Sequence, residues 1–89
     1  MNVDTIRLNR LRWRCRRGML ENDLILARFL DGRGESLTDG EATSLGRLLD
    51  FADGELWNLL SGHAEPDDPA LQPLLSAIRR QGETTPEAP

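Results

Sequence analysis

The apolar residues of this chain recur at the spacing of amphipathic helices. Residues 45–52 and 71–78 each carry four apolar side chains at i, i+3, i+4 and i+7, which places the four on one helix face. Residues 8–15 carry a narrower stripe at i, i+3 and i+7. Residues 19–31 are apolar over more than half of a helix circumference, and this pattern predicts a helix at the centre of the fold.

A glycine marks the boundary between the first two expected helices. The first should run from Asp4 to about Arg16, and the second from near Met19 to about Asp31. Gly18 lies between them, at the position where a residue without a side chain most often ends a helix. We therefore expect two consecutive helices joined by a short loop.

The next two helices have their own start and stop signals. Thr38 and Glu41 form a Thr-x-x-Glu capping box, in which each side chain accepts a hydrogen bond from the other residue's backbone N–H. The third helix, with its core face over residues 45–52, ends at Asp53-Gly54. That pair can cap a short fourth helix, which Gly62 stops.

The fifth expected helix has Asp68 as its N-cap and Pro69 at the first helical position, where proline costs least. Beyond it, residues 82–89 are polar and contain proline, and we expect them to form a disordered tail. Because short helices are marginal in isolation, five of them must bury their faces against one another. The fold class is therefore all-α, a small five-helix bundle that forms a single domain over residues 1–81.

The composition supports helices and excludes several kinds of chemistry. Leucine occurs 16 times among 89 residues, valine and isoleucine together occur four times, and tyrosine is absent, which disfavours a sheet. With one cysteine and one histidine, the chain has no internal disulfide, no Cys-x-x-Cys motif and no histidine cluster for a metal. No acid–base constellation is evident, so we expect a binding protein and not an enzyme.

The single cysteine has two interpretations. Cys15 lies among arginines, which can lower the pKa of a thiol and make it reactive. It also continues the apolar stripe of the first helix, and free cysteine is usually buried, so we expect a buried and unreactive thiol. His63 follows a glycine in an expected loop, and we interpret it as a surface residue.

Charge is distributed unevenly along the chain. Residues 1–20 hold six arginines and one acid, a balance of +5, whereas residues 21–89 hold five arginines and fourteen acids, a balance of −9. An arginine-rich face is the usual footprint of a nucleic-acid-binding module. Against that alternative, the whole chain has an isoelectric point near 4.9. We expect no nucleic-acid partner, and no membrane insertion, since no apolar run approaches the roughly 20 residues of a spanning helix.

The most unusual stretch surrounds Gly18. Local rules explain it as a helix boundary, with Arg16 and Arg17 favourable near a helix C-terminus and Glu21 favourable in the first turn of the next helix. The alternative is a docking patch, in which a bare glycine lets a partner approach closely and opposite charges orient it. Trp13, which falls off the apolar stripe and near Arg17, would be the aromatic anchor of that patch.

A resemblance to a known family favours the docking patch. Residues 13–21, Trp-Arg-Cys-Arg-Arg-Gly-Met-Leu-Glu, resemble the Trp-x-Cys-Arg-Arg-Gly-Met-x-Glu stretch of the bacterial FAD assembly factor family SdhE, whose mitochondrial relatives are succinate dehydrogenase assembly factor 2. Arg17, Gly18 and Glu21 match the Arg-Gly-x-x-Glu signature of that family. Residues 48–62 are similar to its second recurring region.

The resemblance implies a function that needs no catalytic group in this chain. Such proteins promote covalent attachment of FAD to a histidine of the flavoprotein subunit of succinate dehydrogenase, and of fumarate reductase in bacteria. Arg17, Gly18 and Glu21 would contact this client protein, with Arg16 and Trp13 as neighbours on the same surface. We expect a cytoplasmic monomer that binds no cofactor tightly and acts on the FAD of its client. An antitoxin-like regulatory role is the remaining alternative.

Overall fold

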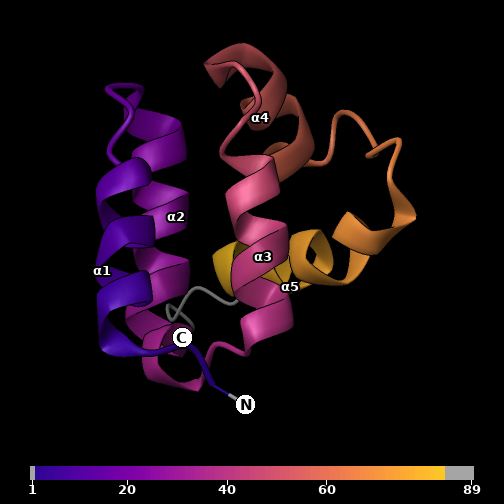
Figure 1. Ribbon diagram of the computed structural model, residues 1–89. Coiled ribbons are helices and arrows are strands. Elements are labelled where there is room, and N and C mark those ends of the chain that lie inside the picture. Colours follow the sequence, from indigo (N-terminus) through magenta and orange to yellow (C-terminus); the bar gives the residue numbers. More distant parts are fainter. Residues whose placement is uncertain (1, 84–89) are drawn as a thin grey trace, which may run out of the picture.

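Five α-helices and two short 3-10 helices make up the computed structural model, which describes residues 2–83 (Figure 1). The expected all-α, five-helix fold is confirmed. The last helix includes the first two residues assigned to the tail, and residues 84–89 lie outside the described residues. No helix within the described range has the length and hydropathy to cross a bilayer. In chain order the elements are α1 (Thr5–Arg14), α2 (Leu20–Arg33), η1 (Gly34–Ser36), α3 (Asp39–Leu48), α4 (Asp53–Ser61), η2 (Pro69–Leu71) and α5 (Gln72–Glu83).

Caps and a glycine set three helix ends where the sequence predicts them, whereas α1 ends well before Gly18. At the start of α1, the Asp4 carboxylate accepts the Arg7 N–H at 2.7 Å. Thr38 and Glu41 form the expected capping box at the start of α3. Gly62 has a φ of 88° and ends α4 in the left-handed conformation. These three helix ends are therefore set by local capping interactions.

The turn between α3 and α4 differs from the expectation. The N–H groups of Asp50 and Phe51 bond to carbonyls three residues back, so the chain leaves the α-helical period after Leu48. Ala52, which we expected on the core face of the third helix, is exposed and is the N-cap of α4, in place of the expected Asp53-Gly54 pair. In a smaller difference, Asp68 caps the 3-10 helix η2 and α5 begins only after it.

The helix expected at the centre, α2, packs against both α4 and α5, and α1 packs against α3. In Figure 1, α1 and α2 lie to the left of α3, and α5 crosses behind α3. The stripes expected on α3 and α5 are buried, apart from Ala52. Burying a leucine side chain contributes about 1.5–3 kcal/mol, so these stripes hold the bundle together. The largest fully buried apolar side chains are Phe29, Leu26, Leu30, Leu37, Leu45, Leu48, Leu56, Leu75 and Ile78.

Three of the α1 arginines form ion pairs with acids of later elements. Each pair is largely exposed, and pairs of this kind contribute about 0–1 kcal/mol. Together they join the basic first helix to the acidic remainder of the chain, on α2, on α3 and in the turn that follows α3. The pairs are Arg7–Asp39 (3.7 Å), Arg12–Asp31 (3.2 Å) and Arg14–Asp50 (2.7 Å).

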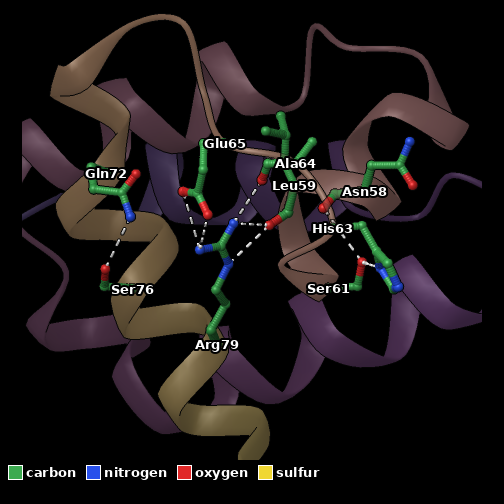
Figure 2. A network of polar contacts seen from close by, with 9 residues as sticks. All are labelled: Asn58, Leu59, Ser61, His63, Ala64, Glu65, Gln72, Ser76 and Arg79. Carbon is green, nitrogen blue, oxygen red and sulfur yellow. Dashed lines mark hydrogen bonds and ion pairs between the residues drawn. The ribbon is translucent and has the colours of Figure 1, made fainter.

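A second arginine network lies where the end of α4 and the segment after it meet α5 (Figure 2). The Arg79 guanidinium donates to the Leu59 carbonyl at 2.6 Å and to the Ala64 carbonyl at 3.0 Å. Glu65 lies 3.5 Å from the same guanidinium. Because the last carbonyls of a helix have no partner within it, Arg79 satisfies the end of α4 from α5.

Candidate functional site

The segment between α1 and α2 is an exposed loop shaped by one glycine. Gly18 has a φ of 93°, a left-handed conformation that residues with a Cβ rarely adopt. A Cβ built on Gly18 would meet nothing within 4 Å. The position therefore requires glycine for its backbone conformation, and the space beside it is open to another molecule.

Two carboxylates of α2 lie beside this loop. Asp23 accepts the N–H of Arg17 at 2.9 Å and the N–H of Gly18 at 3.2 Å, and so fixes the path of the backbone before the helix. Glu21 lies in the first turn of α2 and is exposed. The helix dipole favours a negative charge there, so Glu21 presents its charge to solvent at the edge of the loop.

The structure places Arg17 differently from its neighbours in the signature. Its side chain is only 17% exposed, and the guanidinium turns inward. Nε donates to an Asp53 carboxylate oxygen at 2.5 Å, and the other two nitrogens donate to the carbonyls of Leu49 at 2.7 Å and Phe51 at 2.6 Å. Arg17 therefore contacts the turn between α3 and α4, whereas Gly18 and Glu21 face solvent.

Trp13 lies outside the core, at the end of α1, and is 72% exposed. The sequence placed it near Arg17, but its partner in the structure is Arg16, whose guanidinium carbon is 5.4 Å from the ring centroid. Arg16 is also exposed. A cation over an indole face is favourable by about 0.5–1 kcal/mol at exposed sites, so the pair is held together while both groups remain accessible.

Sequence reasoning missed two further exposed apolar residues at this site. Leu20 and Leu24, one turn apart on α2, are 68% and 48% exposed. The apolar circumference of α2, more than half of the helix, predicts a central helix, but one side of it is left unpartnered. The signal that could have found them is the apolar excess of α2 itself, since α4 and α5 cover only part of its circumference. With Ile6 and Trp13, they are the large hydrophobic residues that stand exposed among the described residues.

A groove of about 670 Å³ runs between α1 and α2 beside the loop. Arg12 and Arg16 line it from α1 and the segment after it, and Leu24 and Ala27 line it from α2. The groove borders Gly18 and also contacts Arg16, which stacks on Trp13, while Leu20 and Glu21 follow Gly18 at the start of α2. We call the surface around this loop the hairpin surface, and define it by Trp13, Arg16, Gly18, Leu20, Glu21 and Leu24.

Among the remaining candidates for chemistry, Cys15 lines the floor of the groove and His63 lies away from it. Cys15 is buried, and burial raises the pKa of its thiol to about 11, although the charges of Arg14 and Arg17 act in the opposite direction. The expected burial of Cys15 is therefore confirmed, and its low reactivity stays a prediction that the raised pKa supports. His63 is exposed, as expected, and its Nδ1 lies 2.6 Å from the Ser61 hydroxyl (Figure 2). Over residues 2–83, no group of three or more ligand side chains is placed to hold a metal ion.

The arginine face that suggested a nucleic-acid module is largely occupied. Three of its arginines form the ion pairs described above, and Arg17 is committed to the turn after α3. Among residues 2–83, Arg10 and Arg16 have no acidic partner, and Arg16 is engaged with Trp13. Most of the positive charge of the first helix is therefore paired with acids of the same chain.

Comparison with known proteins gives a consistent set of relatives. A family model described as "Flavinator of succinate dehydrogenase" matches residues 9–82, a range that contains the whole hairpin surface. The chain is 44% identical over 70 residues to the FAD assembly factor SdhE of Methylococcus capsulatus, covering 79% of this chain and 84% of that protein. It is 40% identical over 80 residues to the protein of the same name in Ralstonia nicotianae, covering 85% and 84%. For the one in Coxiella burnetii, the identity is 38% over 71 residues, covering 80% and 87%.

Proposed function

Because this chain belongs to the family of succinate dehydrogenase flavinators, we propose that it binds the flavoprotein subunit of succinate dehydrogenase and promotes covalent attachment of FAD to it. The relatives named as FAD assembly factors, each matched over most of its length, support this proposal. The flavoprotein of fumarate reductase is a second client that we include in the proposal. The protein acts here as an assembly factor, and the FAD belongs to its client.

The observation that carries the proposal is the hairpin surface. Gly18 is open, Glu21 and Arg16 present opposite charges on either side of it, and Trp13 provides an exposed aromatic ring. Aromatic and arginine side chains are the residues most enriched in binding hot spots. Leu20 and Leu24 add apolar area that nothing within residues 2–83 covers. Such a surface suits another folded protein better than a small substrate.

The proposed action is positioning. A protein that binds one conformation of its client more tightly than another shifts the client toward that conformation. Holding two reacting groups in contact can contribute about 7–11 kcal/mol toward a reaction in well-oriented systems, without any new chemical group. In this proposal the client's own histidine and flavin react, and this chain supplies only binding energy that favours their approach.

Co-expression with a flavoprotein subunit of succinate dehydrogenase tests the proposal directly. The subunit is produced with and without this protein, denatured, separated on a gel and examined for flavin fluorescence, which reports the covalent bond. We expect strong fluorescence only when both proteins are present. Equal fluorescence without this protein would overturn the proposal. A parallel arm with a fumarate reductase flavoprotein decides the second client.

Other expectations from the sequence stay predictions. These are a cytoplasmic location, a monomeric state and the lack of a tightly bound cofactor. Purified protein examined by light scattering and by its visible absorption spectrum would test the last two. The antitoxin-like and nucleic-acid alternatives gain no support from any feature of the hairpin surface.

A further inference from the structure

Arg17 uses its whole guanidinium within the protein. Its three nitrogens donate to three different acceptors, the Asp53 carboxylate and the carbonyls of Leu49 and Phe51, at 2.5–2.7 Å. These acceptors lie 32 to 36 residues away in sequence. A side chain with this many short hydrogen bonds and 17% exposure has little capacity to bind another protein as well.

The acceptors are groups that need a donor. The Leu49 and Phe51 carbonyls belong to the tight turn after α3, where carbonyls lack helical partners. Asp53 opens α4, and its carboxylate receives the charge-assisted hydrogen bond from Arg17. Arg17 therefore connects the α1–α2 loop to the α3–α4 turn, and Figure 1 shows both connections at the same end of the bundle.

Asp53 also reaches α2 by a second route. Its backbone carbonyl accepts the Asn22 side-chain amide at 3.0 Å, and Asn22 is fully buried. On the other side of the loop, the Asp23 carboxylate holds the N–H groups of Arg17 and Gly18. Asp23 thus fixes the loop through its backbone N–H groups, and Asp53 fixes it through the Arg17 side chain.

We propose that Arg17 is a positioning residue whose contact with Asp53 holds the Gly18 loop in its binding conformation, and that it does not touch the client. This inference rests on the proposed function, since it assigns a role within the same surface. A loop already held in the bound conformation loses less entropy on binding, which raises affinity without a new contact. Asp53, which lies outside the Arg-Gly-x-x-Glu signature, shares this positioning role because it binds the Arg17 guanidinium.

The test compares two conservative variants and their combination. Arg17→Lys keeps the charge but cannot reach three acceptors with one ammonium group. Asp53→Asn keeps the size and removes the charged acceptor. The dissociation constant for a purified flavoprotein subunit is measured by calorimetry, and hydrogen exchange of the Gly18 amide is measured by NMR in the free protein. Circular dichroism confirms that each variant is folded at the temperature used.

We expect each single variant to bind the client about tenfold more weakly, with the double variant no weaker than either, since the two residues act through one contact. Gly18 amide exchange should accelerate in all three. The matched control is the exposed pair Arg14–Asp50, which joins α1 to the same turn without touching the loop. Arg14→Lys and Asp50→Asn should leave affinity and Gly18 exchange unchanged.

A direct contact between Arg17 and the client makes different predictions. Asp53→Asn would then leave affinity unchanged, or the losses from the two variants would add, and either result overturns the positioning role. Unchanged Gly18 exchange in both variants would overturn it as well, and this measurement needs no client. Failure of the proposed function is recognised separately, because the wild-type protein would then show no binding to the flavoprotein at all.

Discussion

At the level of single residues, Arg17 and Gly18 are neighbours in sequence with opposite environments. Arg17 is enclosed by acceptors of the α3–α4 turn, whereas the space beside Gly18 is empty. A glycine with a φ of 93° and no neighbouring atoms can accept a side chain sterically, at the cost of a strained backbone. Substitution at Gly18 can therefore separate binding from folding.

Gly18→Arg should block client binding in a protein that remains folded. The left-handed backbone should cost about 1–2 kcal/mol, and the new side chain would occupy the space that we assign to the client. The measurements are thermal unfolding by circular dichroism and client affinity by calorimetry. Gly40→Arg is the matched control, since Gly40 is exposed near the start of α3, and only Thr38 comes within 4 Å of a Cβ built there. Retained client binding in Gly18→Arg would contradict the assignment of this surface.

Glu21→Ala should weaken client binding by about 1 kcal/mol or more, roughly fivefold, if its carboxylate contacts the partner. Glu55 offers a close comparison, because it is also exposed in the first turn of a helix, α4. The two substitutions remove the same favourable dipole interaction, so their effects on stability should be similar. Affinity for the flavoprotein, measured side by side, should fall only for Glu21→Ala. Equal losses in both variants would count against the hairpin surface.

At the level of elements, most helices can be predicted from the sequence, but the way they pack against one another cannot. Thr38 and Glu41 predict the start of α3 because a capping box is local and depends on residues three apart. Ala52 was misplaced because the helical period alone does not show that α3 ends at Leu48 in a tight turn. The partnership of Arg17 with Asp53 is set by tertiary packing, and no local pattern indicates it.

The hairpin surface could likewise be predicted only in part from the sequence. The sequence predicts a break at Gly18, although α1 ends earlier, at Arg14, and the exposed Trp13 follows from its position off the apolar stripe. The apolar excess of α2 indicates that some of its apolar side chains stay exposed, but only the packing of the other helices decides that Leu20 and Leu24 are among them. The inward turn of Arg17 is likewise a consequence of the fold.

The capping box of α3 should give stability a specific pH dependence. Burial opposes ionisation of Glu41, but hydrogen bonds from Thr38 and Arg33, with the Arg33 charge, outweigh it and lower its pKa below the ordinary value of 4.5. A lowered pKa in the folded state means that the stabilisation is present above about pH 4.5 and is lost as the pH falls through the folded value. Glu41→Gln should therefore cost about 1 kcal/mol near pH 6 and less near pH 3, as measured by urea unfolding. The same cost at both pH values would be inconsistent with this mechanism.

At the level of the whole molecule, the opposite charges of its two halves have a structural role. The basic first helix lies against acids of α2, α3 and the turn after α3, so its arginines neutralise their own protein. The exposed surface of α1, α2 and the loop between them carries both apolar and charged side chains. Trp13 and Leu24 are apolar, and Arg16 and Glu21 are charged. This face is suited to a protein partner, and its binding should depend mainly on apolar contact.

That distribution predicts how salt affects binding. Nucleic-acid binding relies on arginines that neutralise phosphates, and it weakens steeply as salt rises. Here the formal net charge is −4 and most α1 arginines are paired, so gel-shift assays with DNA and RNA should show no complex even at low salt. The client complex should change little in affinity over the same salt range, because we expect the exposed apolar residues Trp13, Leu20 and Leu24 to provide most of the contact. Replacing Asp31 and Asp50 by asparagine frees Arg12 and Arg14, and this variant should gain weak, salt-sensitive nucleic-acid binding. A salt-sensitive shift with the wild-type protein would instead show that the first helix keeps enough free positive charge to recognise phosphate.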